Sequence, residues 1–211
     1  MKIMSNSFKD GEMIPGDFAF AVQNVETHIQ LSSNRNPHLA WEEVPEGTLS
    51  FVVVVHDPDV PSKGDDVNQD NRVVPATLPR VAFFHWLLLD IPASTTEITS
   101  GSHSQAVIPR GKSGPFTPDG LRHGINDFTS WFAGDAQMEG HYFGYDGPCP
   151  PWNDELVHRY VFTLYALSVP SLEVIGELSG ANILAALDKN VVIGTATLTG
   201  LYTLNPSLKM K

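Results

Sequence analysis

The stretch VVVVHDPDVP, residues 52–61, joins a run of valines to two aspartates and two prolines. Valine is enriched in strands, and an unbroken apolar run of this length is typical of a strand that is covered on both faces. Aspartate and proline favour strand ends and turns. The stretch therefore predicts a buried strand that ends at His56, Asp57 and Asp59, either in an ordinary turn or at the wall of a pocket.

Other stretches extend this pattern along the chain. Strong strands are predicted over residues 49–57, 81–92 (VAFFHWLLLDIP), 158–168 (HRYVFTLYALS) and 195–204 (TATLTGLYTL), and weaker ones over 17–22 and 38–41. The spacing of Ile183, Leu184 and Leu187 predicts a helix over residues 180–190, with Ser179 as its N-cap. A shorter helix is expected over residues 171–178, SLEVIGEL.

The order of these elements indicates the fold class. Helices do not alternate with the strands, so a parallel sheet built from βαβ units is disfavoured. We expect a mainly β protein, an antiparallel β-sandwich with one or two short helices near the C-terminus. No repeat or linker-like break interrupts the sequence, and residues 1–211 are predicted to form a single domain.

Composition narrows the classes of function. The chain has 13 Lys and Arg against 24 Asp and Glu, a formal net charge of −11, which argues against nucleic acid and anionic membranes as partners. It has one cysteine, Cys149, and therefore no intrachain disulfide. The first residues lack the apolar core of a signal peptide, and no apolar run approaches the ~20 residues of a membrane helix. These features predict a cytoplasmic protein without membrane insertion.

Polar residues stand at or within the strong strands. His85 lies inside FFHWLLL, and His158 opens the strand that follows YDGPCPPWNDELV. Taken singly, each is most often a hydrogen-bonded core residue, and an Asp-Pro pair is most often a turn. Their combination is more informative than any one of them.

The motifs DPDVP, FHWLLL, GPCPP and HRYVFTLYAL occur in this order. The series resembles the phosphatidylethanolamine-binding protein family, in particular its bacterial branch of Raf-kinase-inhibitor-like proteins. The N-terminal MKIMSNSFKDGEMIP and the C-terminal GANILAALDKNVVIGTATLTGLY are similar to that branch as well. The resemblance covers most of the chain.

The resemblance implies a small anion-binding cavity at one end of a β-sandwich. By position, the cavity would be lined by Asp57, His85 and His158 with Tyr160 nearby, and its rim would be formed by Asp59, Gly147, Pro148 and Pro150. It also suggests a cis bond between Val60 and Pro61. Three departures stand out: Phe84 replaces a common Trp, residues 62–79 form a long polar connection, and WNDELV at 152–157 differs from the usual pattern. We expect all three to lie around the pocket mouth.

The chemistry of such a pocket follows from its residue types. Two imidazoles can donate N–H groups to phosphate oxygens, and a carboxylate on the far ring nitrogen raises the imidazole pKa. We therefore expected anion affinity to rise as the pH falls from about 8 to about 6. An aspartate could also accept from an ammonium group such as that of ethanolamine. The long connection over residues 62–79 was expected to act either as a lid or dimer-facing flap, or as an unused surface loop.

Other classes of function remain open. A hydrolase lacks a Gly-x-Ser-x-Gly elbow around Ser102 or Ser104. A thiol enzyme would need Cys149 and a base, and a metal site drawn from His56, Asp57, Asp59, His85 and His158 lacks a tight ligand spacing. The sequence predicts a non-catalytic protein that binds phosphate or a phosphoethanolamine-like anion, with no cofactor and no metal. The alternative is a module that inhibits a kinase or a protease, and the resemblance permits a homodimer.

Overall fold

The computed structural model describes residues 1–187 and 191–208. Its elements, in chain order, are β1 (Lys2–Met4), the 3-10 turn η1 (Gly16–Phe18), β2 (Ala21–Asn24), β3 (His28–Leu31), β4 (Leu39–Glu42), β5 (Ser50–Pro61), β6 (Arg80–Pro92), β7 (Glu97–Ile98), β8 (Arg122–His123), α1 (Phe128–Trp131), β9 (His158–Leu167), α2 (Gly180–Ala186) and β10 (Val192–Tyr202).

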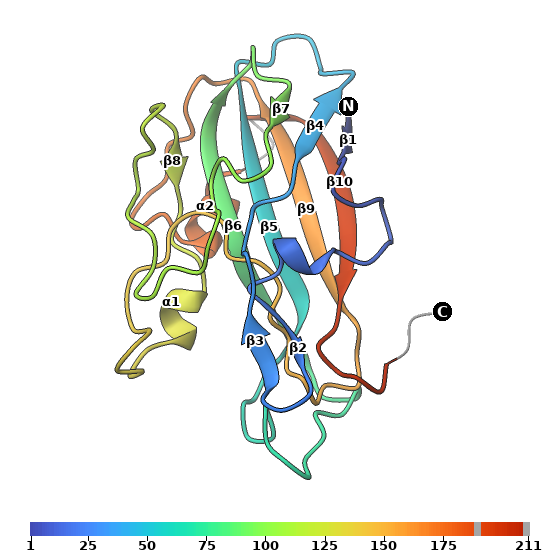
Figure 1. Cartoon of the computed structure of the whole chain (residues 1–211). Helices are drawn as coiled ribbons and strands as arrows, with labels where there is room; N and C mark the ends of the chain where they lie inside the picture. The colour runs from blue at the N-terminus through green and yellow to red at the C-terminus, as the bar shows by residue number, and fades with distance from the viewer. Residues whose placement is uncertain (188–190, 209–211) are drawn as a thin grey trace.

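Five strands form the central sheet in the order β10-β9-β5-β6-β8, and each neighbouring pair is antiparallel. The four long strands lie side by side in Figure 1. β5 is in the middle, where Val55 is paired with Trp86 of β6 and with Phe162 of β9. The valine run thus forms the centre of the sheet.

Both faces of this sheet are buried. Side chains alternate between the faces of a strand, so Val53 and Val55 join one apolar cluster while Val52 and Val54 join another. This is why β5 carries a continuous apolar run instead of an alternation of apolar and polar residues. The sequence prediction of a strand covered on both sides is confirmed.

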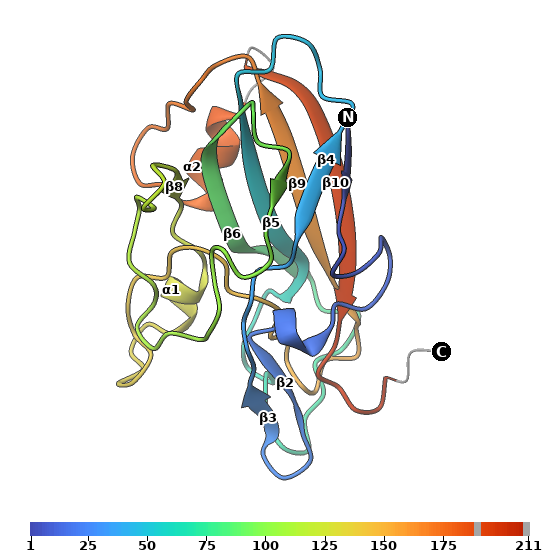
Figure 2. The ribbon, with the colours of Figure 1, turned by 45° about the horizontal axis from the view of Figure 1, so that its top comes forward.

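Different elements cover the two faces. On one side lies the short sheet β1-β4-β7, whose Trp41 packs edge-on against Phe51 with ring centroids 5.3 Å apart. On the other side α2 buries Ile183 against the second cluster. Figures 1 and 2 show β4 and β7 in front of the sheet and α2 behind it. The expected mainly β sandwich with antiparallel sheets is confirmed.

The strand predictions hold with shifted ends. β5 continues through the Asp-Pro-Asp motif to Pro61 instead of ending at Asp57, and β10 begins and ends earlier than residues 195–204. Of the weaker predictions, 38–41 corresponds to β4, while 17–22 is divided between η1 and β2. The continuation of β5 matters for the site, because it keeps Asp57 and Asp59 within a paired strand.

Only one of the two predicted helices forms. In α2 the Ser179 side chain accepts a hydrogen bond from the N–H of Asn182, as expected of an N-cap. The helix ends at Ala186, and residues 188–190 of the predicted range lie outside the described residues. The helix over 171–178 is wrong, since the Leu172 N–H donates to the Asp90 carboxylate and Gly176 has a φ of +85°.

A second α-helix, the four-residue α1, lies in the irregular segment between β6 and β9 and was not predicted. Four residues are too few for a helical period to show in the sequence.

No helix in the described part of the chain is long and apolar enough to cross a membrane.

Candidate functional site

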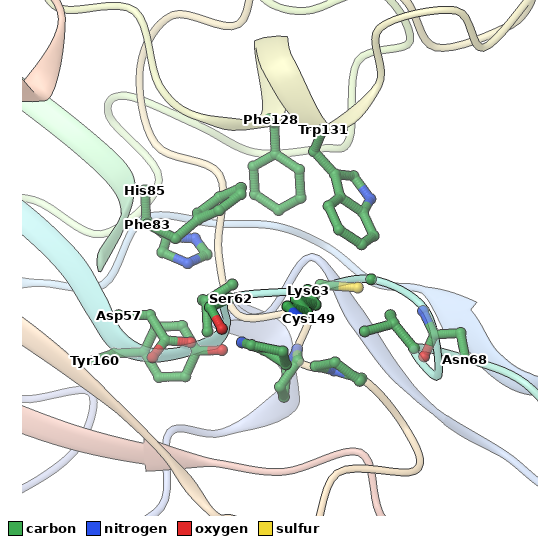
Figure 3. A pocket seen from close by; sticks show the side chains of 16 residues that line it. Asp57, Ser62, Lys63, Asn68, Phe83, His85, Phe128, Trp131, Cys149 and Tyr160 are labelled. Atoms are coloured by element: carbon green, nitrogen blue, oxygen red, sulfur yellow. The ribbon is translucent and has the colours of Figure 1, made fainter. Parts of the chain in front are cut away.

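A cavity of about 120 Å³ lies at the end of β5 and β6. Its polar side is formed by Asp57, His85 and Tyr160, which Figure 3 shows gathered at one end of the cavity. These residues come from three neighbouring strands of the central sheet, β5, β6 and β9. Strand pairing therefore brings together side chains that lie far apart in the sequence.

The rest of the cavity wall is largely apolar. Aromatic rings of Phe83, Phe128 and Trp131 cover one side, as Figure 3 shows. The remaining lining residues are Val60, Pro61, Ser62, Lys63, Gly64, Val67, Asn68, Cys149, Pro150 and Pro151. A small polar end enclosed by apolar walls is a common design of ligand pockets. The motifs in the sequence did not point to these three aromatic residues, two of which lie on α1.

His85 is neutral at physiological pH. Its Nδ1–H donates to the carbonyl oxygen of Asp146 over 2.8 Å. Burial lowers the pKa of His85 to about 4, despite the opposing influence of Asp57 and of this hydrogen bond. With Nδ1 used as a donor, Nε2 is left as the ring nitrogen that can accept from a ligand.

His158 has the opposite character. It is fully buried, and its Nδ1 donates to Asp57 Oδ2 over 2.6 Å while its Nε2 donates to Asp154 Oδ2 over 3.1 Å. Burial alone would lower its pKa, but the two carboxylates outweigh burial and raise it to about 9. His158 is therefore an imidazolium, and it does not line the cavity.

Asp57 connects this cation to the cavity. One carboxylate oxygen binds His158, and the other accepts the backbone N–H of Asp59 over 2.7 Å. Its side chain is thereby fixed at the cavity wall, and its negative charge is balanced from behind. The Asp57 carboxylate of β5 thus stands in the cavity wall, and the neighbouring Asp59 N–H helps to orient it.

The surrounding charges are balanced as well. Asp59 points away from the cavity and binds the Arg159 guanidinium through both oxygens, at 2.7 and 2.8 Å. Arg80 binds both oxygens of Asp154 at 2.5 and 3.0 Å. The charge network around Asp57 contains three carboxylates and three cations, of which Arg159 is exposed: Asp57, Asp59, Asp154, Arg80, His158 and Arg159.

The Gly-Pro segment forms the back of the site. A Cβ on Gly147 would lie 2.1 Å from the Phe18 carbonyl oxygen, so only glycine fits there. The Pro148 carbonyl accepts the Phe20 N–H over 2.9 Å, which ties this segment to the N-terminal part of the chain. Pro150 lines the cavity, whereas Gly147 and Pro148 do not.

Two groups in the cavity have unused chemistry. The Tyr160 hydroxyl is buried and makes no hydrogen bond of normal geometry among the described residues, and burial together with the nearby Asp57 carboxylate raises its pKa well above the usual value. Burial also raises the pKa of the Cys149 thiol to about 12, so Cys149 carries its proton at neutral pH. Within residues 1–187 and 191–208, no group of three or more His, Cys, Asp or Glu side chains could hold a metal ion.

One structural expectation at the site is wrong. The Val60–Pro61 bond is trans, and the one cis bond in the described residues is Gly114–Pro115. β5 stays paired with β6 as far as Pro61, so a sharp turn before this residue is not needed to place Asp57.

Comparison with known proteins agrees with this architecture. The model of the family described as phosphatidylethanolamine-binding protein matches residues 4–203. The chain belongs to this family. The chain is 33% identical over 174 residues to a UPF0098 protein of Aquifex aeolicus, covering 82% of this chain and 71% of the relative. It is 31% identical to the UPF0098 protein YbhB of Escherichia coli, covering 86% and 87%.

A solved relative supports the fold across nearly the whole chain. The crystal structure of Escherichia coli YbcL, titled a new member of the mammalian PEBP family, has a TM-score of 0.66 and 29% identity, covering 96% of this chain and 97% of that one. The recognition of the phosphatidylethanolamine-binding protein family from ordered motifs is thus confirmed, together with the bacterial branch. The ligand-binding role of the individual residues stays a prediction.

The predicted site residues of this phosphatidylethanolamine-binding protein divide into two groups. Those that line the cavity are Asp57, His85, Pro150 and Tyr160, and those that do not are Asp59, Gly147, Pro148 and His158. Two residues at which the sequence departs from the family pattern, Phe84 and Trp152, were expected at the pocket mouth but lie elsewhere. Phe84 packs on the opposite face of the sheet with the α2 cluster, and Trp152 stacks on His28 with ring centroids 3.8 Å apart.

Proposed function

We propose that this protein binds a small phosphate-bearing ligand of the phospholipid-headgroup type and does not catalyse a reaction. The observation that carries the proposal is the small cavity whose polar end offers three differently equipped groups, Asp57, His85 and Tyr160. The Tyr160 hydroxyl, which has no partner among the described residues, is available to donate to a phosphate oxygen. Ser62 and Lys63 add a hydroxyl and an ammonium group at the rim.

Binding of an anion is coupled to a proton. Neutral His85 presents only an acceptor to the cavity, so it must take up a proton at Nε2 before it can donate to a phosphate oxygen. The free-state pKa of about 4 then sets the pH range. The affinity should rise by about tenfold per pH unit as the pH falls toward that value. This range replaces the one expected from the sequence, since His158 uses both ring nitrogens within the protein.

The same geometry supports binding over catalysis. The Cys149 thiol is protonated because its pKa is raised to about 12, and His158 lies behind Asp57, away from any ligand in the cavity. Neither residue can serve there as an activated nucleophile or an accessible base.

The rival function is inhibition of a kinase or a protease through surface contact. One observation favours it: Trp131, which lines the cavity, is 51% exposed. Exposed aromatic residues are common anchors in protein interfaces. Such a function would not depend on the polar end of the cavity.

Isothermal titration with glycerophosphoethanolamine tests the proposal, because its phosphodiester keeps a constant charge between about pH 5 and about pH 7. We expect tighter binding at the lower pH, and an uptake of about one proton when the heats in two buffers of different ionisation enthalpy are compared. His85→Ala should abolish binding. His141→Ala is the matched control, since His141 is exposed and does not line the cavity.

Two results would overturn the proposal: no binding by the wild type at either pH, or unchanged binding by His85→Ala. Binding without pH dependence would contradict the proton uptake at His85 and would mean that the ligand binds while the His85 ring is neutral.

A further inference from the structure

Residues 62–79 form part of the cavity wall. Five lining residues come from the start of this connection: Ser62, Lys63, Gly64, Val67 and Asn68. The start of the long polar connection is thus part of the cavity wall. Two of the five, Val67 and Asn68, lie in the stretch 66–72.

One side chain holds the middle of this segment. Asn153 is buried, its Oδ1 accepts the Asn68 N–H over 3.0 Å, and its Nδ2 lies 2.8, 3.3 and 3.1 Å from the carbonyl oxygens of Asp66, Gln69 and Arg72. A single asparagine therefore contacts the backbone at four places between residues 66 and 72. The loop is folded around this side chain.

Few other contacts hold this stretch to the rest of the protein. The Trp152 N–H donates to Asn68 Oδ1 over 3.0 Å, and an exposed His28 ring contacts Asp70. An exposed pair such as His28 and Asp70 contributes little to stability. Asn153 is accordingly the main buried attachment of residues 66–72.

The end of the segment is attached to the neighbouring residues. Val74 donates to the Asn153 carbonyl and accepts from the Glu155 N–H, both over 3.1 Å. The next residue in the sequence after Asn153 is Asp154, which binds His158 and Arg80. Asn153 therefore holds the loop of the cavity wall, and the next residue, Asp154, belongs to the charge network around Asp57.

We propose that Asn153 is a positioning residue that fixes residues 66–72 as a rigid wall, so that the cavity accepts a headgroup and excludes the acyl chains of an intact lipid. Asn153 itself does not line the cavity. The cavity of about 120 Å³ is far below the ~300–1,000 Å³ of pockets that enclose drug-sized ligands. A lipid with two acyl chains therefore requires the wall to move. This inference rests on the proposed function and adds the size limit of the ligand.

The test compares two probes that share one headgroup, glycerophosphoethanolamine and monomeric dihexanoyl-phosphatidylethanolamine. We expect the wild type to prefer the small probe. Asn153→Ala should lower this preference by about tenfold or more, mainly through tighter binding of the dihexanoyl lipid. Because both probes carry the same phosphoethanolamine group, a general loss of headgroup affinity cancels in the ratio.

Asn36→Ala is the matched control. Asn36 is also a buried asparagine with four backbone contacts: it accepts from His103 and Ser104 and donates to Pro37 and Thr99. The segment it holds, residues 99–104, does not line the cavity. Asn36→Ala should lose stability like Asn153→Ala and keep the wild-type preference between the probes.

A second variant, Asn153→Asp, serves if the alanine variant does not fold. The aspartate side chain has the shape of asparagine and keeps an oxygen that accepts the Asn68 N–H. Its second oxygen replaces the NH2 group and faces the three carbonyl oxygens, so the repulsion should release residues 66–72. If the folded Asn153 variants keep the wild-type preference between the probes, the inference about Asn153 is wrong. It is also wrong if Asn36→Ala changes this preference as much as the Asn153 variants do. Neither result affects the proposed function. Failure of the wild type to bind either probe overturns the proposed function as well.

Discussion

The two buried histidines beside Asp57 show how differently one residue type can behave within a single sheet. His85 on β6 lines the cavity and has a pKa lowered to about 4. His158 on β9 lies behind the cavity wall and has a pKa raised to about 9. Both are buried, so burial alone does not explain the difference.

The second ring nitrogen decides the outcome. In His85 one nitrogen donates to a backbone carbonyl and the other is free for a ligand, an arrangement that a neutral ring satisfies. In His158 both nitrogens face carboxylates, which requires a ring with two protons. His85 is therefore a neutral residue of the cavity wall, whereas His158 is a charged residue that holds Asp57 in place.

The largest effect that tests this comparison is on stability. His158→Gln leaves the Asp57 and Asp154 carboxylates without the cation between them, and we expect the free energy of unfolding to fall by about 3–5 kcal/mol. His85→Gln removes a neutral ring with one backbone hydrogen bond, and about 1 kcal/mol is expected. Urea unfolding at neutral pH measures both. Equal losses in the two variants would contradict the assigned roles.

The pH dependence of stability gives the next largest effect. The pKa of His158 is raised in the folded state from 6.5 to about 9, so its contribution is complete below pH 6.5 and is lost as the pH rises to 9. The loss is about 3 kcal/mol, since each pKa unit corresponds to ~1.4 kcal/mol. The pKa of His85 is lowered to about 4, so its contribution is lost as the pH falls from 6.5 toward 4.

Unfolding curves between these pH values should separate the two residues. His158→Gln should flatten the alkaline side of the stability profile, and His85→Gln should flatten part of the acidic side. A parallel shift of the whole profile in His158→Gln would show that His158 is not charged in the folded protein.

The sequence allowed the sheet to be predicted because its evidence is local. A valine run, and the alternation of Tyr160, Phe162 and Leu164 with their neighbours, depends only on the strand that contains it. The ordered motifs also placed both histidines at one end of the sheet. They did not show that His158 turns away from the cavity.

That orientation depends on residues outside the motifs. Asp154 lies in WNDELV, the segment that departs from the family pattern, and it binds Arg80, the first residue of β6. Asn153 in the same segment folds the loop that lines the cavity. Contacts of this kind join irregular segments, which have no period to reveal them. Phe128 and Trp131 were missed for the same reason.

The smallest expected effect concerns Tyr160, the third polar residue of the cavity. Its hydroxyl has no hydrogen-bond partner within the described residues, so Tyr160→Phe should change the free energy of unfolding by less than about 0.5 kcal/mol. Tyr145→Phe is the control, because the Tyr145 hydroxyl donates to the Phe18 carbonyl over 2.6 Å. Loss of that bond should cost about 1 kcal/mol.

Ligand affinity should show the reverse order. If the Tyr160 hydroxyl donates to the phosphate, Tyr160→Phe should weaken the binding of glycerophosphoethanolamine by roughly tenfold, the usual effect of one hydrogen bond to a charged group. Tyr145→Phe should leave it unchanged, since Tyr145 does not line the cavity. Titration of both variants at the same pH distinguishes a hydroxyl kept for a ligand from one that supports the fold. A Tyr160→Phe variant that is destabilised and binds normally would place Tyr160 with His158, among the residues that build the wall.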